Sequence, residues 1–193
     1  MIRRQFLFII AAMILVLGSV GVSGAATLDG TAPNGTSLKN AVSSHGANVI
    51  FMRHALAPGY GDPNDFDIAD CSTQRNLDAR GRQQAQELGQ LFQSSGLTIN
   101  AILSSRWCRC QDTAIEMNIG AYRTHDGLNS FFQDHVDRDE TLGLLREELS
   151  TIKSDDVVLM ITHQVVIQAI TGISPRSGGM VLFNSRTGQS LRF

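Results

Sequence analysis

Two short apolar runs, each followed by a histidine, constrain the fold of this chain more than any other feature. The first run, from Asn48 to Met52, ends at Arg53 and His54. The second run, from Asp156 to Ile161, is followed closely by His163. A continuous apolar run of this length between polar residues is typical of a strand buried on both faces. We therefore expect a sheet that is covered on both sides.

Helical patterns alternate with further short apolar runs. Apolar residues at helical spacing, such as Ala85, Leu88 and Phe92, predict a helix. The expected helices span residues 37–44, 77–92, about 106–117, 137–152 and 164–170, and further strands span residues 100–103, 178–183 and 189–193. Residues 57–70 are rich in proline, glycine and aspartate, which predicts a long surface loop. Strands that alternate with helices indicate an α/β fold with helices on both faces of the sheet.

The N-terminal residues have the pattern of a secretory signal peptide. Arg3 and Arg4 precede an uncharged run from Phe6 to Val22. Ser23 and Ala25 follow at the spacing that a signal peptidase accepts. We therefore expect cleavage after Ala25 and a mature protein outside the cytoplasm.

This interpretation divides the chain into three parts. Residues 1–25 are the signal peptide, residues 26–36 a flexible leader and residues 37–193 the functional domain. The apolar run is also at the short edge of what spans a bilayer, so an uncleaved anchor is the alternative. With cleavage, the chain contacts the membrane only through the signal peptide, and the domain is periplasmic or secreted.

The charged residues at the predicted strand ends favour the binding of a small anion. The net charge of −2 argues against nucleic acid as a partner, so an anion must meet a few positioned cations. Arg53, His54 and His163 follow two strands, and Arg109 begins a helix after a third. The carboxyl ends of such strands form one ligand-binding edge of the sheet. Two guanidiniums and two imidazoles there suit a phosphate dianion, and a histidine can form a phosphohistidine that water hydrolyses.

The three cysteines fit one disulfide bridge in an exported protein. A bridge from Cys71 to either Cys108 or Cys110 would contribute about 3–4 kcal/mol on the loop-entropy model. Free thiols are the alternative. The pair Cys108 and Cys110 lacks zinc or CxxC spacing, so we expect no metal site and no cofactor. The odd cysteine has no assigned role.

Four segments, in the same order along the chain, resemble motifs of the histidine phosphatase superfamily, also called the phosphoglycerate-mutase-like family. Residues 51–55 (FMRHA) resemble its RHG motif, with Ala55 in the glycine position. Residues 77–85 (LDARGRQQA) resemble its L-T-x-x-G-x-x-Q-A helix start, and residues 103–114 (LSSRWCRCQDTA) are similar to L-S-S-P-x-x-R-A-x-x-T-A. Residues 161–163 (ITH) stand where the family has its second histidine.

This resemblance implies a three-layer α/β/α sandwich with a mostly parallel central sheet and a metal-independent phosphatase activity. It implies that His54 is the nucleophile, that Arg53 and Arg109 bind the phosphoryl group, and that His163 stabilises it. The expected partner is a small phosphorylated substrate. The short chain resembles the branch that includes phosphohistidine phosphatases and an exported lipopolysaccharide-core phosphatase.

The sequence departs from the family at the general acid. Many members carry a glutamate in a segment where this chain has Ser130. An acid is needed to protonate a leaving alkoxide, whose pKa is high. Asp134 is our first candidate for this acid and Asp126 the second, and His135 and His125 lie in the same stretch. Alternatively, the substrate has a leaving group that needs no acid.

The leading interpretation is an exported phosphatase that hydrolyses a phosphomonoester through a phosphohistidine. The alternative is a catalytically weak module that binds phosphate or a sugar phosphate and has lost its acid at Ser130. A thiol-redox or metal protein and a mutase rank lower.

Two further cations lie beside the motifs. Arg75 either binds a second anionic group or pairs with Asp62, Asp65 or Asp67, and for Arg106 we favour pairing at the surface.

Overall fold

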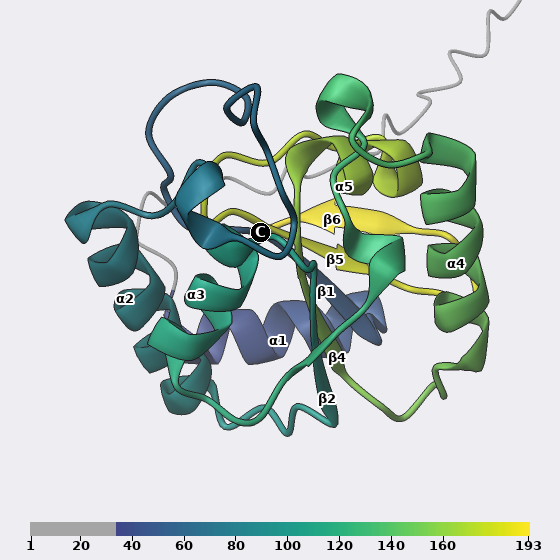
Figure 1. Cartoon of the computed structure of the whole chain (residues 1–193). Helices are drawn as coiled ribbons and strands as arrows, with labels where there is room; N and C mark the ends of the chain where they lie inside the picture. The colour runs from purple at the N-terminus through teal and green to yellow at the C-terminus, as the bar shows by residue number, and fades with distance from the viewer. Residues whose placement is uncertain (1–33) are drawn as a thin grey trace, which may run out of the picture. The chain divides into compact units, whose positions relative to one another are not determined.

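The two apolar runs form the middle of the sheet in the computed structural model, which describes residues 34–193 (Figure 1). The first run is β1 (Val49–Arg53) and the second is β4 (Val158–Thr162), and the two strands pair in parallel. The sheet has the order β3-β2-β4-β1-β5-β6. Its other strands are β2 (Ala101–Ser104), β3 (Arg123–Thr124), β5 (Met180–Phe183) and β6 (Ser190–Arg192).

The mostly parallel sheet and the three-layer arrangement are confirmed. Within residues 34–193, β5 alone runs in the opposite direction to the rest of the sheet, and it pairs antiparallel with β1 and β6. Helices α1, α2 and α3 cover one face of the sheet, and α4 and α5 cover the other (Figure 1). The helices are α1 (Gly35–His45), α2 (Ala79–Ser95), α3 (Cys108–Met117), α4 (Arg138–Thr151) and α5 (Gln164–Thr171), with short 3-10 turns η1 (Cys71–Thr73), η2 (Asp126–Leu128) and η3 (Phe132–Asp134).

Polar capping residues fix where three of these helices begin. The side chain of Asp78 accepts a hydrogen bond at the start of α2, and the side chain of Asp137 does so at the start of α4. Asn34 caps α1, which therefore begins at Gly35 and includes the last residues of the predicted leader. The predicted signal peptide and the rest of that leader lie outside the described residues.

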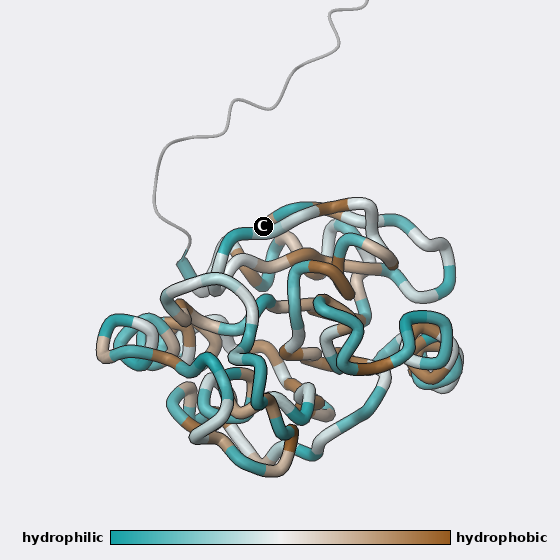
Figure 2. Tube along the Cα trace, turned by 45° about the horizontal axis from the view of Figure 1, so that its top comes forward, coloured by the Kyte–Doolittle hydropathy of each residue, from teal (hydrophilic) through white to brown (hydrophobic). Residues whose placement is uncertain are grey.

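Strand β1 is buried on both faces, as its continuous apolar run predicts. Ile50 and Met52 pack into the core under α1, α2 and α3, whereas Val49 and Phe51 pack under α4 and α5. All four side chains are fully buried. Figure 2 shows the hydrophobic stretches mainly inside the molecule, with hydrophilic residues along the surrounding loops. This two-sided burial fixes β1 and the residues that follow it.

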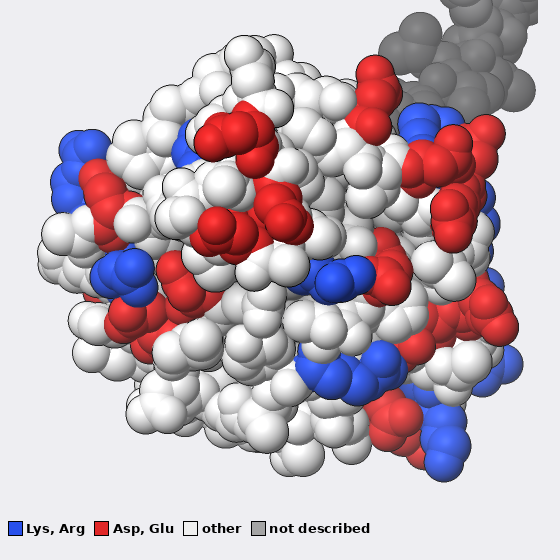
Figure 3. All heavy atoms as spheres, in the orientation of Figure 1, with Lys and Arg blue, Asp and Glu red and all other residues white. Residues whose placement is uncertain are grey.

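The described surface carries both signs of charge. On the face drawn in Figure 3, acidic and basic side chains are interspersed without a broad area of one sign. A basic stripe of the kind that holds a polyanion is therefore not seen on this face. Among residues 34–193, no helix is both long enough and apolar enough to cross a membrane.

A disulfide bridge joins the long surface loop to the first residue of α3. It connects Cys71 with Cys108, across a sequence separation of 37 residues, and thereby resolves the choice between the two expected pairings. Cys110 is a free, buried thiol. Gln74 supports the same junction, because its side-chain oxygen accepts the Cys108 N–H at 2.9 Å. We call residues 55–76 the tethered loop.

Removing the bridge should lower stability without unfolding the sheet. We expect the double variant Cys71→Ser, Cys108→Ser to lose about 3–4 kcal/mol of unfolding free energy, because its unfolded chain is no longer cross-linked. Urea titration of the variant and the oxidised wild type measures this difference. As a control on pairing, the denatured, unreduced wild type should expose a single reactive thiol, that of Cys110. Three reactive thiols, or equal stability, would contradict the assignment.

Candidate active site

The two histidines that follow β1 and β4 lie side by side. The His54 N–H donates to the Thr162 carbonyl at 2.9 Å, which continues the parallel ladder beyond the strands. The imidazole centroids of His54 and His163 are 5.4 Å apart. Both side chains are buried, although they line a cavity. The register of two adjacent strands therefore sets the spacing of the two imidazoles.

The four residues expected to hold a phosphate, Arg53, His54, Arg109 and His163, line a single cavity of about 340 Å³. Arg109 reaches it from the first turn of α3, and its side chain is only 3% exposed. Arg53 reaches it from the end of β1. The remaining lining residues come from the tethered loop, the segment around η3 and the start of α5: Gly59, Tyr60, Gly61, Arg75, Ser130, Phe132, Gln164 and Val165.

His54 is held as a neutral imidazole with one free nitrogen. Its Nδ1 lies 2.7 Å from the carbonyl oxygen of Ala55. A carbonyl can only accept, so the proton is on Nδ1 and Nε2 keeps its lone pair. Burial, and then the positive charge of Arg109, lower the pKa of His54 well below its ordinary value. His54 is thus in the protonation state that a nucleophile requires.

His163 contacts a serine hydroxyl and the free thiol. Its Nε2 lies 3.0 Å from Ser105 Oγ and 3.5 Å from Cys110 Sγ. Burial, and then Arg109, lower the pKa of His163 as well. Burial raises the pKa of the Cys110 thiol to about 12, so this cysteine packs as a neutral group. Among residues 34–193, no cluster of three or more His, Cys, Asp or Glu side chains is arranged to hold a metal ion.

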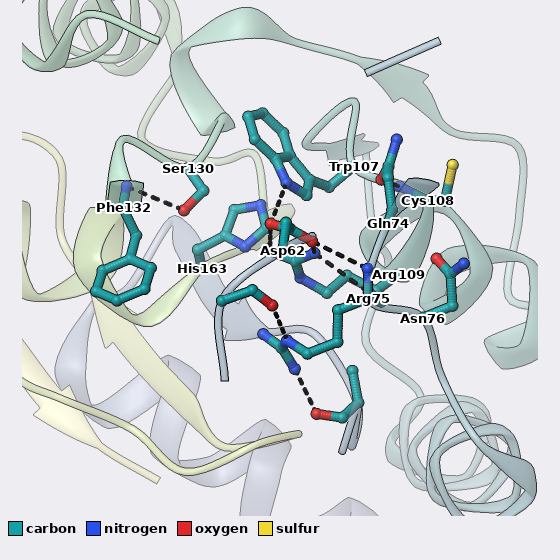
Figure 4. Close-up of polar contacts among 12 residues, drawn as sticks. Asp62, Gln74, Arg75, Asn76, Trp107, Cys108, Arg109, Ser130, Phe132 and His163 are labelled. Carbon is teal, nitrogen blue, oxygen red and sulfur yellow. Dashed lines mark hydrogen bonds and ion pairs between the residues drawn. The ribbon is translucent and has the colours of Figure 1, made fainter. Parts of the chain in front are cut away.

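Asp62, in the tethered loop, is expected from the sequence only as one of three possible partners of a neighbouring arginine, and the structure pairs it with Arg109. Its carboxylate forms a forked ion pair with Arg109, at 2.7 Å to Nη1 and 3.1 Å to Nη2. It also accepts the indole N–H of Trp107 at 3.0 Å and the backbone N–H of Arg75 at 3.0 Å (Figure 4). Burial raises the pKa of Asp62, but the hydrogen bonds and charge of Arg109 outweigh it and bring the pKa below its ordinary value.

Arg53 and Arg109, the two arginines expected to bind phosphate, each have a bonded Nη atom and an Nε atom without a partner among the described residues. Asp62 holds the Nη atoms of Arg109, and Gln164 accepts from Arg53 Nη1 at 2.8 Å. The Nε atoms of both arginines are buried and have no hydrogen-bond partner among the described residues. A buried N–H without a partner is costly. These two groups are therefore well suited to donate to the oxygens of a bound anion.

Arg75 adds a third guanidinium to the cavity. It donates from Nε to the Gly61 carbonyl at 2.9 Å and from Nη1 to the Ala57 carbonyl. Burial, and then the charge of Arg109, lower the pKa of Arg75 to about 10, so it remains charged at neutral pH. With both histidines neutral, three arginines and the Asp62 carboxylate leave two positive charges uncompensated, which matches a phosphate dianion.

The first candidate for the general acid does not reach this cavity. Asp134 is exposed and is not a lining residue, whereas Ser130 is. The backbone explains the difference, because Gln133 and Asp134 have φ values of 70° and 58°. This left-handed turn after Phe132 separates Asp134 from the lining residues. The structure therefore does not support Asp134 as the proton donor.

The other three candidates for the acid also lie outside the cavity lining. Each of them contacts a group elsewhere: Asp126 is 3.7 Å from Arg106, His125 is 3.4 Å from Glu148, and His135 stacks on Phe66 with ring centroids 4.2 Å apart. Among the described residues, no carboxylate lines the cavity itself. A substrate bound there meets cations, imidazoles and aromatic rings, but no obvious acid.

The comparisons with known proteins agree with this fold. Residues 49–131 match the model of the histidine phosphatase superfamily (branch 1). A mycobacterial glucosyl-3-phosphoglycerate phosphatase complexed with VO3 is similar, at 14% identity, 76% coverage of this chain, 97% of that chain and a TM-score of 0.55. A candidate α-ribazole-5′-P phosphatase from Escherichia coli K-12 has 16% identity, coverages of 75% and 94%, and a TM-score of 0.53.

A third similar structure is that of the protein histidine phosphatase SixA complexed with tungstate, at 17% identity, coverages of 75% and 93% and a TM-score of 0.50. At such identities these likenesses establish a shared fold. A comparison with curated protein sequences finds no match.

Proposed function

Because residues 49–131 identify the chain as a member of the histidine phosphatase superfamily, as its motifs predict, we propose that it hydrolyses a phosphomonoester through a phosphohistidine on His54. One observation carries the proposal. An unprotonated His54 Nε2 shares a cavity with two arginine Nε donors that have no partner among the described residues. A nucleophile and the donors for a phosphoryl group are thus in one place.

The proposed reaction has two displacements at phosphorus. In the first, His54 Nε2 forms a bond to phosphorus while the bond to the leaving oxygen breaks, and the leaving group takes that electron pair. Arg53, Arg109 and His163 stabilise the charge on the phosphoryl oxygens. In the second, water attacks phosphorus, the P–N bond breaks, and phosphate leaves with His54 restored. No step assigns a role to a metal ion or a cofactor.

The bound ions and the names of two similar structures support this chemistry. These two hold the oxyanions VO3 and tungstate, and their names describe a glucosyl-3-phosphoglycerate phosphatase and a protein histidine phosphatase. A small phosphorylated substrate is therefore the proposed partner. The second candidate function is a phosphate-binding module, and it is favoured by one observation, the absence of a carboxylate among the described lining residues.

A single-turnover experiment tests the proposal. With phenyl phosphate and excess EDTA, we expect a phosphoryl group to accumulate transiently on the peptide that contains His54, and the same assay with substrate in excess should release inorganic phosphate over many turnovers. Quenching in alkali preserves phosphohistidine for mass spectrometry. Loss of turnover in EDTA would contradict metal independence. Phosphate binding without turnover or phosphoenzyme would favour the binding module.

We also propose that the protein acts outside the cytoplasm. The Cys71–Cys108 bridge supports this location, because disulfides persist mainly in oxidising compartments. Edman sequencing of the protein from an envelope fraction tests it. A mature terminus at Ala26 agrees with export and cleavage, a blocked or intact Met1 in the membrane fraction indicates the anchor, and recovery in the cytoplasm contradicts both.

A further inference from the structure

Two aromatic side chains form an unusual rim on the cavity. Tyr60 is 88% exposed, and its ring meets that of Phe132 edge to face, with centroids 5.2 Å apart. Both residues line the same cavity as His54. Aromatic side chains are enriched at binding interfaces, where they supply a large apolar contact area. We refer to Tyr60 and Phe132 as the aromatic rim.

The rim is held in place by contacts between the two segments that carry it. The side-chain amide of Gln133 accepts the Asp62 N–H at 2.6 Å and donates to the Asp62 carbonyl at 3.2 Å. At Gly61, between Tyr60 and Asp62, an added Cβ would lie 2.7 Å from the Gln133 side chain, and φ is +68°. A side chain here would be strained at this left-handed φ and would displace the end of the Gln133 side chain, so glycine is favoured. The rim is thus fixed before a ligand arrives, which lowers the entropy cost of binding.

The chemistry below the rim limits the leaving group. Ser130 lines the cavity where an acid is expected, and no described lining residue is a carboxylate. Without an acid, the leaving oxygen must depart with its charge. A phenol, with a pKa of about 10, does this far more readily than an aliphatic alcohol. The lack of an acid and the presence of two aromatic rings therefore point to the same kind of ester.

We infer that the aromatic rim binds the ring of an aryl phosphomonoester and makes the site selective for aryl over alkyl and sugar phosphates. The phosphoryl group lies against His54 and the arginines, and the aryl ring contacts Tyr60 and Phe132 at the mouth. This inference rests on the proposed function for turnover, but the binding preference can be measured without turnover.

Phosphonates, which are not hydrolysed, test the rim by calorimetry. Phenylphosphonate should bind the wild type about 10-fold more tightly than methylphosphonate, as expected for one aromatic contact. In Tyr60→Ala and Phe132→Ala the ratio of the two affinities should fall toward one. Tyr60→Phe, which keeps the ring, should preserve the ratio. Leu191→Ala removes another exposed apolar side chain, in β6, and serves as the control.

The outcomes separate this inference from the proposed function. Equal affinities of the wild type for both phosphonates, or a ratio that survives loss of both rings, would overturn the aromatic rim and leave the phosphatase standing. A clear phenylphosphonate preference together with absence of phenyl phosphate turnover would support the rim and overturn the phosphatase. Turnover of phenyl phosphate by the wild type that falls in Tyr60→Ala and in Phe132→Ala supports both.

Discussion

Replacing His54 with alanine is expected to lower kcat by about 10⁴-fold or more and to abolish the phosphoenzyme. The physical reason is that no other imidazole in the cavity has a nitrogen free for attack in the same way. His54 Nδ1 is committed to the Ala55 carbonyl, which leaves Nε2 as the nucleophile, whereas His163 Nε2 contacts Ser105. Steady-state kinetics with phenyl phosphate measure kcat, and single-turnover reactions analysed by mass spectrometry measure the phosphoenzyme.

The variant needs two controls, because His54 is buried. His54→Gln keeps a polar side chain of similar size, and thermal unfolding of both variants shows whether the fold survives. His45→Ala removes an imidazole at the end of α1, away from the cavity lining, and should keep full activity. A phosphoenzyme that persists in a folded His54 variant would show that another residue accepts the phosphoryl group.

The second large effect is expected at Asp62. Removing its carboxylate in Asp62→Ala leaves the Arg109 charge buried without its partner, which costs about 3–5 kcal/mol of unfolding free energy. The freed Nη atoms of Arg109 then become available to an anion. Added phosphate or tungstate should therefore raise the melting temperature of the variant more than that of the wild type. Thermal unfolding with and without these anions measures both quantities.

Acid and a matched substitution check this assignment. The pKa of Asp62 is lower in the folded state than its ordinary value, so the ion pair stabilises the fold above that ordinary value. The contribution is lost as pH falls through the lowered pKa. The difference in stability between wild type and variant should therefore shrink below about pH 4. Asp65→Ala, an exposed aspartate in the same loop, should change little, and an equal loss there would contradict the role of Asp62.

Most of the strands, and the site residues Arg53, His54, Arg109 and His163, could be predicted because their signals are local in the sequence. The apolar run of β1 and the His54 that ends it are adjacent in the sequence, and the same holds for β4 and His163. Edge strand β3 was not predicted, because Arg123 and Thr124 are exposed and polar. These two residues join the sheet through backbone pairing with β2, which leaves no apolar pattern in the sequence. Helix boundaries shifted by a few residues where a capping side chain determines the start.

The rest of the site depends on contacts between distant parts of the chain. Nothing in the sequence distinguishes Asp62 from the other aspartates of its loop, because the bridge to Cys108 and the contacts with Gln133 decide which one meets Arg109. The position of Asp134 is hard to predict for a related reason. Asp134 is close to Ser130 along the chain, but the left-handed backbone at Gln133 and Asp134 places it outside the cavity lining.

The register of β1 and β4 has a consequence for changes in chain length. Arg53 lies opposite Thr162, so the histidines that follow are matched by residue count along two strands. Inserting or deleting one residue in either strand would turn its histidine to the opposite face of the sheet. The tethered loop, which carries Tyr60, has no such register, and surface loops tolerate insertions well. The proposed nucleophile and the proposed aromatic rim therefore lie on segments with different tolerance to length change, and loop redesign that keeps Asp62 paired with Arg109 can alter the rim while the two histidines stay matched.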